Sequence, residues 1–158
     1  MCRQRPEIQK YSSWYGISDI VVDEAATDCT TEASYYAPLY AYIQAHGGSE
    51  MLNPGTTTSQ CYMAATDILD IFEGTYASYV NVTYPAWIKA YPASRFFNEV
   101  YSVATANDMT NVVAKTQASN IGWVYVTNLG LPNPYNALPS YWATEVTTVR
   151  DAFPSCLR

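Results

Sequence analysis

The chain has 158 residues, a mass of 17.6 kDa and a formal net charge of -6, from 8 Lys and Arg against 14 Asp and Glu. A nucleic-acid partner requires a basic stripe, which this acidic composition excludes. No apolar run approaches the about 18 to 20 residues that a membrane-spanning helix needs, so we expect no insertion into a membrane. Aromatic residues make up 15% of the chain, led by 15 tyrosines, a composition typical of secreted and carbohydrate-handling proteins.

Five short apolar runs with polar or acidic ends predict β-strands. In chain order they span residues 18–24, 50–55, 67–74, 95–103 and 121–128. Continuous apolar runs bounded by turn signals are typical of strands that are buried on both faces, as in a parallel sheet.

Segments with helical spacing of apolar residues separate these runs. In chain order the expected helices span the N-terminal stretch up to Trp14, then 30–46, 59–66, 84–91, 105–119 and 140–153. For the helix at 30–46 we expect Thr30 or Thr31 as the N-cap and Gly47-Gly48 as the stop. The alternation of strands and helices predicts an α/β fold with a mostly parallel sheet.

Two α/β architectures remain open on this pattern. A chain of this length holds five βα units of about 30 residues, which completes a doubly wound sheet but falls short of an eight-unit barrel of about 250 residues. The motifs favour the barrel, because no glycine-rich nucleotide motif follows the first strand. Polar residues instead end several different strands, which is where the active sites of barrels lie.

Three carboxylates at strand ends are the candidate catalytic residues. Asp23 and Glu24 follow the first strand, and Glu73 ends the third. Glycoside hydrolysis uses two carboxyl groups, one as an acid and the other as a nucleophile or base. The alternative for the Asp23-Glu24 pair is a solvated loop start or a helix N-cap.

A second group of residues predicts a carbohydrate subsite at the same strand ends. An aromatic face can stack on a sugar ring while hydroxyl and amide groups beside it bind the sugar hydroxyls. The alternative is that these side chains serve only turns, loops and the core. The candidate substrate-binding residues are Asn53, Trp123, Tyr125, Thr127 and Asn128.

Cysteine and histidine counts argue against a metal. The chain has four cysteines without a CxxC pair and a single histidine, His46, so a structural zinc site is not expected. We expect no metal and no cofactor. The sequon Asn81-Val82-Thr83 is of use only in a secreted chain, whereas the N-terminus shows no signal peptide.

Four motifs, in order and with matching spacing from about Pro6 to Phe153, resemble the spherulin-4 family, also called spherulation-specific family 4. They are Trp14-Tyr15-Gly16-Ile17-Ser18-Asp19-Ile20-Val21-Val22-Asp23-Glu24, Asn53-Pro54-Gly55-Thr56, Phe72-Glu73 and Gly122-Trp123-Val124-Tyr125-Val126-Thr127-Asn128.

The resemblance implies a (β/α)8 TIM barrel, of which this chain holds about five βα units, strands 4 to 8, as a single partial barrel domain over 1–158. It also implies a glycoside hydrolase that cuts an N-acetylgalactosamine-containing, galactosaminogalactan-like polysaccharide of the fungal cell wall or spore matrix. The acidic active-site residues carry over to Asp23, Glu24 and Glu73. The alternatives are a non-catalytic carbohydrate-binding spore or wall protein and an inactive truncated product.

Two further expectations depend on that barrel. Cys29 and Cys61 would lie in neighbouring βα loops, close enough to form a disulfide, which a secreted protein would oxidise. A full-length form is expected outside the cell or in the cell wall. The oligomeric state, and whether the reaction retains or inverts the anomeric configuration, do not follow from the sequence.

Overall fold

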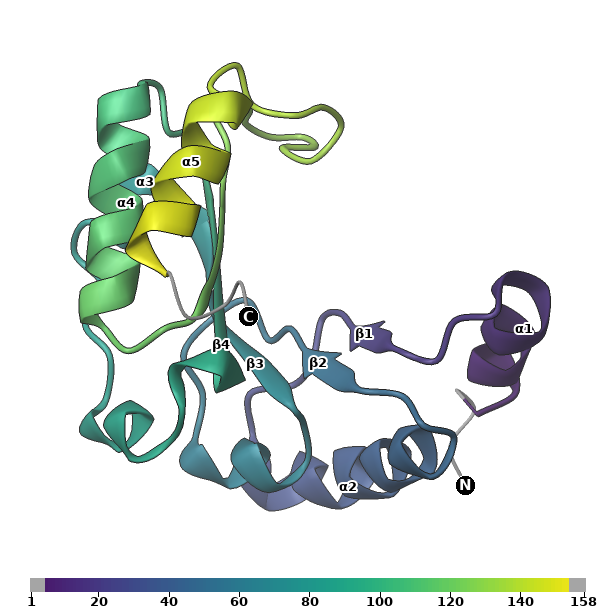
Figure 1. Cartoon of the computed structure of the whole chain (residues 1–158). Coiled ribbons are helices and arrows are strands. Elements are labelled where there is room, and N and C mark those ends of the chain that lie inside the picture. The colour runs from purple at the N-terminus through teal and green to yellow at the C-terminus, as the bar shows by residue number, and fades with distance from the viewer. Residues whose placement is uncertain (1–4, 154–158) are drawn as a thin grey trace. The chain divides into compact units, whose positions relative to one another are not determined.

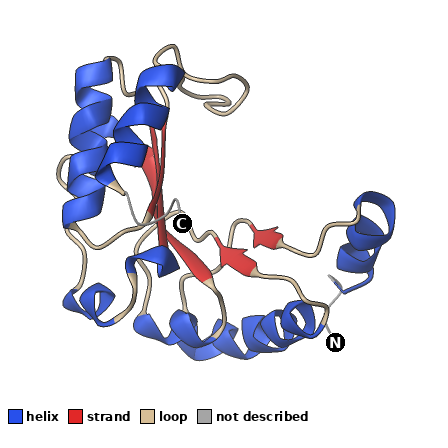
Figure 2. Ribbon diagram, viewed as in Figure 1, coloured by secondary structure: helices blue, strands red, loops and turns tan. Residues whose placement is uncertain are grey.

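The computed structural model describes residues 5–153, apart from the side chains of residues 29–33. Helices and short strands alternate along the described chain (Figures 1 and 2). The elements are α1 (Arg5–Tyr15), β1 (Ile20–Val22), α2 (Cys29–Ala45), β2 (Glu50–Leu52), η1 (Gln60–Ala64), β3 (Ile68–Thr75), α3 (Tyr76–Tyr79), η2 (Ala86–Ala90), η3 (Ala93–Arg95), β4 (Phe96–Tyr101), α4 (Ala106–Ala118), β5 (Trp123–Val126) and α5 (Trp142–Ala152).

All five predicted strands are confirmed, as are the long helices. The two shorter predicted helices form as the 3-10 turns η1 and η2. The predicted N-cap of α2 is wrong, because the helix already begins at Cys29 and so contains both Thr30 and Thr31. None of the described helices is long and apolar enough to cross a bilayer.

The five strands form one sheet in the sequential order β1-β2-β3-β4-β5. The pairs β1/β2, β2/β3 and β4/β5 are parallel, which confirms the predicted parallel α/β sheet. Doubly wound sheets reverse their strand order at a switch point, and no such reversal occurs among the described strands. The sequential order therefore argues against the doubly wound alternative, while closure into an eight-stranded barrel stays a prediction.

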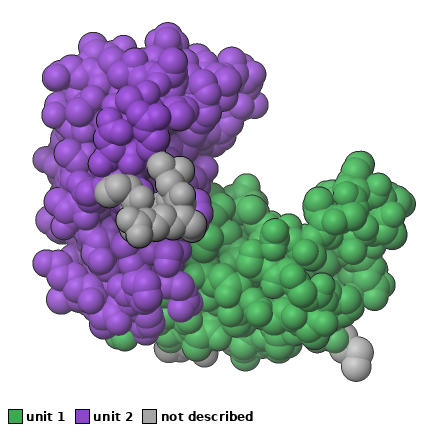
Figure 3. All heavy atoms as spheres, in the orientation of Figure 1, with its two compact units in different colours: residues 1–71 green, residues 72–158 purple. Residues whose placement is uncertain are grey.

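The chain divides into two compact units, residues 1–71 and 72–158 (Figure 3). The boundary falls within β3. In unit 1, the buried Ile8, Leu39 and Ile43 form the core that holds α1 and α2. Helix α2 ends as predicted, because Gly47 takes a φ of 75° and the Gly48 N–H donates to the Ile43 carbonyl at 3.1 Å, an αL termination of the Schellman type.

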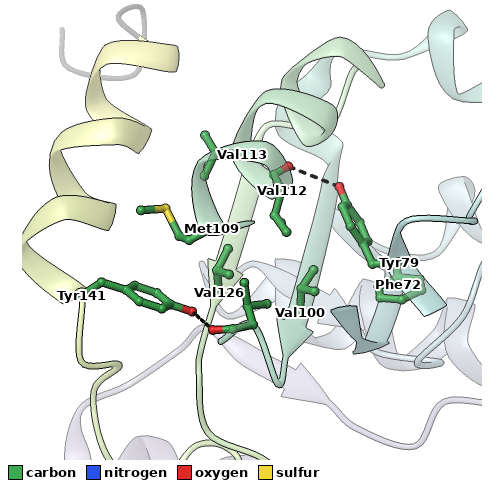
Figure 4. Close-up of a cluster of buried hydrophobic side chains, with 9 residues drawn as sticks. Phe72, Tyr79, Val100, Met109, Val112, Val113, Val126 and Tyr141 are labelled. Atoms are coloured by element: carbon green, nitrogen blue, oxygen red, sulfur yellow. Dashed lines mark hydrogen bonds between the residues drawn. The ribbon is translucent and has the colours of Figure 1, made fainter. Parts of the chain in front are cut away.

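Unit 2 has a hydrophobic core of its own, shown in Figure 4, where α4 and α5 cover its strands. The Tyr141 hydroxyl donates to the Val103 carbonyl at 2.9 Å, so this tyrosine is buried without losing its hydrogen bond. Thr105 caps α4 by accepting from the Asp108 N–H at 3.1 Å. The core consists of Phe72, Tyr79, Val100, Val103, Met109, Val112, Val113, Val126 and Tyr141.

A buried polar network fixes β4 against α4. The fully buried Asn98 donates to the Tyr79 hydroxyl at 3.3 Å, and that hydroxyl pairs with the Thr116 hydroxyl at 2.7 Å. Tyr84 donates to the Asn98 amide oxygen at 3.2 Å. Because buried polar groups need partners, this network fixes which face of β4 meets the helix.

Candidate functional site

The face of the unit 2 sheet that carries the candidate site follows from strand alternation. Phe72 and Val126 belong to the unit 2 core, and Asn98 joins the polar network beneath α4. Successive strand residues point to opposite faces. Their neighbours along the chain therefore share the face turned away from that core, and these are Glu73, Glu99 and Tyr125.

Glu73 and Glu99 approach each other on this face, with carboxylate oxygens within 4.8 Å. Tyr135, from the loop between β5 and α5, donates its hydroxyl to Glu73 Oε1 at 2.6 Å. Burial raises the pKa of the Tyr135 phenol, and the hydrogen bond to Glu73 and the charge of Glu99 raise it further. The phenol therefore stays protonated and acts as a hydrogen-bond donor to the carboxylate.

Tyrosine rings flank this carboxylate pair. Tyr125 lies opposite Glu99 in the β4/β5 register. Its ring centroid is 6.0 Å from that of Tyr135 and 6.4 Å from that of Trp142. Aromatic rings next to carboxylates provide an apolar face and charged acceptors in one place, which is the chemistry that a sugar ring with hydroxyl groups requires.

Gly74 of β3 leaves room for the Phe72 ring beside the backbone. A Cβ at this position would lie 2.9 Å from Cζ of Phe72, and Phe72 stacks edge-on against Tyr79 at 5.1 Å. A larger residue at position 74 would displace the ring of Phe72, which is the residue directly before Glu73.

In unit 1 the predicted acidic pair lies directly after β1. Asp23 and Glu24 are both exposed, and Asp23 Oδ1 accepts from the Glu24 N–H at 2.9 Å and from Asn53 Nδ2 at 3.1 Å. Glu24 has a φ of 51°, a left-handed conformation that is uncommon for a residue with a side chain.

Asn53 connects this pair to the end of β2. Its side chain is nearly buried, at 7% exposure, and its Oδ1 accepts from the Gly55 N–H at 2.7 Å. The amide thus binds a turn with its oxygen and Asp23 with its nitrogen. The structure brings Asn53 to Asp23 as a side chain that orients the carboxylate.

The remaining predicted residues of β5 divide into two groups. Tyr125 lies beside Glu99, as described, whereas Trp123 begins the strand and donates its Nε1–H to the Ser94 carbonyl at 2.8 Å. Trp123 therefore lies at the opposite end of β5 from the predicted subsite. Its role in binding stays a prediction that this placement does not favour.

Thr127 and Asn128 support the loop that carries Tyr135. Thr127 is fully buried and accepts from the Leu129 N–H at 3.1 Å. Asn128 Oδ1 accepts from the Ser140 N–H at 2.7 Å, which ties the two ends of the loop together. Both side chains hold the loop in place, so their contribution to a subsite acts through Tyr135.

The disulfide prediction stays partly open. Cys61 is disulfide-bonded, but the side chain of Cys29 lies outside the described residues. The pairing of these two cysteines remains a prediction.

Sequence reasoning did not single out Glu99 or the contact of Tyr135 with Glu73. Glu99 is the sole acid in the segment Phe96–Tyr101, which forms β4. An acid inside a strand segment that is otherwise uncharged was the available signal. Tyr135 lies 62 residues from Glu73 along the chain, so no local pattern connects them.

A buried acid of α5 lies against β5. Glu145 is 2% exposed and accepts from the Val126 N–H at 2.8 Å. Burial raises its pKa to about 7, although that hydrogen bond lowers it. It lines a groove of about 340 Å³ together with Trp142 and Val146.

The carboxylates near Glu73 do not by themselves require a metal ion. Hard cations such as Ca²⁺ take about six to eight oxygen ligands, whereas Asp70, Glu73 and Glu99 bring one oxygen each within 4.8 Å of one another. The expectation of no metal and no cofactor stays a prediction.

The described chain is thus an α/β protein whose parallel strands present carboxylates and tyrosines on one face of unit 2. Comparison with known families identifies the family of this chain. The family model of spherulation-specific family 4 (Spherulin4) matches residues 3–149, and the chain belongs to this family.

Two individual proteins are similar over most of the chain. Spherulin-4 of Physarum polycephalum is 30% identical over 156 residues, which cover 90% of this chain and 46% of that protein. The crystal structure of Aspergillus clavatus Sph3 in complex with N-acetylgalactosamine (GalNAc) matches with a TM-score of 0.75 at 19% identity, covering 92% of this chain and 64% of that one. The chain therefore spans about half the length of spherulin-4 and under two thirds of the Sph3 chain.

Proposed function

We propose that this chain is the site-bearing part of a glycoside hydrolase that acts on a GalNAc-containing polysaccharide of the fungal cell wall or spore matrix, outside the cell. The observation that carries the proposal is the Glu73, Glu99 and Tyr135 arrangement beside the Tyr125 ring. The complex of Sph3 with GalNAc supports the sugar class, because the two chains share a fold.

The proposed chemistry divides the carboxylates between proton transfer and attack at the anomeric carbon. Glu24 and Glu73 take these two roles, and Asp23 orients its neighbour. The contacts of Asp23 with Asn53 Nδ2 and the Glu24 N–H support the orienting role, since both occupy the same carboxylate oxygen. The acid protonates the leaving glycosidic oxygen while the second carboxylate attacks or activates water.

Tyr125 gives this reaction its sugar-binding surface. Its ring, next to that of Tyr135, offers a face for the apolar side of a galactosamine ring. The Tyr135 phenol donates to Glu73 Oε1 and holds that carboxylate in place beside the two rings.

The sheet order supports the finer fold proposal. Sequential parallel strands are what consecutive units of a (β/α)8 barrel produce, and we assign β1 to β5 to barrel strands 4 to 8. In that assignment Asp23 follows barrel strand 4 directly and Glu73 lies near the end of barrel strand 6, and the carboxyl ends of strands are where barrel enzymes carry catalytic residues.

The test compares wild-type protein with Glu73→Gln and Glu24→Gln on a GalNAc-containing polysaccharide, with release of reducing ends as the measurement. Each substitution removes a titratable carboxyl with little change in volume, so both should abolish turnover and leave the circular dichroism spectrum unchanged. Glu7→Gln, at an exposed position on α1, is the matched control and should retain full activity. Full activity in both active-site variants would refute the assignment.

A binding protein without catalysis is the second candidate, favoured by the Tyr135 hydroxyl that already occupies Glu73 Oε1. It predicts glycan binding by the wild type without release of reducing ends. Isothermal titration with GalNAc oligosaccharides distinguishes the two, because a binding protein would keep its affinity in Glu24→Gln and Glu73→Gln.

A further inference from the structure

The single N-glycosylation sequon of the sequence, Asn81-Val82-Thr83, lies on a tight turn of unit 2 directly after α3. The Asn81 N–H donates to the Ser78 carbonyl at 3.2 Å, and the Val82 N–H donates to the Tyr79 carbonyl at 3.1 Å. These bonds turn the chain outward at the acceptor residue.

Lys115 of α4 fixes the same turn from the inside. Its Nζ donates to the carbonyls of Tyr79, Val80 and Val82 at 2.8, 3.0 and 3.1 Å. The ammonium also lies 5.1 Å from the centre of the Tyr79 ring. An ammonium has three donors, and here all three are used on the backbone that surrounds Asn81.

The side chains of the sequon point the other way. Asn81 and Thr83 are both exposed, and Asn81 Nδ2 donates to the Ala77 carbonyl at 3.2 Å at the surface. The backbone is therefore held by the fold, while the two groups that a glycosyltransferase must reach face solvent.

We propose that Asn81 is the acceptor of an N-linked glycan when the chain enters a eukaryotic secretory pathway. The donor is an oligosaccharide on a lipid pyrophosphate. A bond forms between Asn81 Nδ2 and the anomeric carbon, the bond from that carbon to the pyrophosphate oxygen breaks, and the lipid pyrophosphate leaves with the electron pair. Nδ2 loses one proton to base and keeps the other.

The folded structure accommodates the product. The remaining N–H of Nδ2 can still donate to the Ala77 carbonyl, so the turn keeps its surface hydrogen bond. A groove of about 390 Å³ begins at Val82 and Thr83 and continues past Lys89 and Ser119. It offers the first sugar a place next to the acceptor without displacing a side chain of the unit 2 core.

This inference is independent of the proposed hydrolase activity, because its evidence is the turn at residues 78–83 and the contacts of Lys115. A binding protein or an inactive protein with the same fold would carry the same modification.

The experiment expresses the full chain behind a cleavable secretion signal in a yeast host and measures intact mass in both the lumenal fraction and the medium. Treatment with a glycan amidase, which leaves aspartate in place of the modified asparagine, locates the site by peptide mass spectrometry. The variants are Asn81→Gln and Thr83→Ala. Asn136→Gln replaces an exposed asparagine outside any sequon and is the matched control.

The expected result is a mass increase that the amidase removes, complete loss of that increase in Asn81→Gln and Thr83→Ala, and its retention in Asn136→Gln. Wild-type protein without sugar in the lumen overturns the proposal, as does sugar that persists in Asn81→Gln. Sugar found only on retained aggregates, with unmodified soluble protein in the medium, also overturns it, because the folded turn would then not carry the glycan.

Discussion

Glu50 makes the stability of unit 1 depend on pH in a direction opposite to that of most carboxylates. It is the first residue of β2 and is 1% exposed, and neither carboxylate oxygen has a hydrogen-bond partner among the described residues. Burial raises its pKa from the usual 4.5 to about 8, with a further contribution from the charge of Asp67. The folded protein therefore holds a proton that the unfolded chain releases.

The size of the effect follows from proton linkage. A carboxyl with a raised pKa stabilises the fold fully below its unfolded pKa, and this stabilisation is lost as the pH rises toward the folded pKa. One proton changes the free energy of unfolding by at most about 1.4 kcal/mol per pH unit. With the pKa values of 4.5 and about 8, the free energy of unfolding should therefore fall by about 2.5 kcal/mol between pH 5 and pH 7.

Glu50→Gln should remove this part of the pH dependence. The measurement is urea unfolding at pH 5, 6 and 7, followed by far-UV circular dichroism. The buried amide of the glutamine lacks partners and costs about 1 to 3 kcal/mol at pH 5, so the change of stability with pH, and not its absolute value, is diagnostic. Glu7→Gln on the exposed face of α1 is the control. If Glu50→Gln and wild type lost equal stability between pH 5 and pH 7, the reasoning would be refuted.

Three further predictions concern unit 2. Thr105→Ala removes the cap of α4 and should lower the free energy of unfolding by about 1 kcal/mol, whereas Thr110→Ala, at an exposed position in the same helix, should change it less; equal losses would contradict the cap. Met109→Ala empties part of the fully buried core and should cost about 2 to 5 kcal/mol by chemical denaturation, and a loss below 1 kcal/mol would mean that the core closes around it. Tyr135→Phe removes the donor to Glu73, and because hydrogen bonds to charged groups contribute about 1.5 to 3 kcal/mol, kcat for reducing-end release should fall about 10- to 100-fold. An unchanged kcat in an active enzyme would show that the phenol does not position Glu73.

The secondary structure followed from the sequence because its signals are local. Apolar runs with polar ends marked all five strands, and Gly47-Gly48 marked the end of α2. The start of α2 was misplaced because threonine is a good N-cap by type, while the helix begins at Cys29, before either threonine. Strand order could not be derived in the same way, since length favoured a doubly wound sheet and the motifs favoured a barrel.

The candidate site was only partly predictable, because its contacts join distant parts of the chain. Glu73 was expected at a strand end, but its partner Tyr135 comes from a loop whose position depends on Thr127 and Asn128. Those two residues were expected to bind substrate, and the structure shows them holding the loop. Glu99 was overlooked because an acid in the middle of an apolar strand gives no sign of which face it occupies until Asn98 is seen to meet α4.

The turn after β2 influences the position of Asp23 indirectly, through the side chain of Asn53. Gly55 takes a φ of 67°, which residues with a side chain rarely adopt, and its N–H holds the Asn53 oxygen so that the Asn53 nitrogen faces Asp23. A substitution at position 55 would therefore move an acidic group that it never touches. Variation in this turn gives the protein a means of adjusting its acidic pair while the pair itself stays unchanged in sequence.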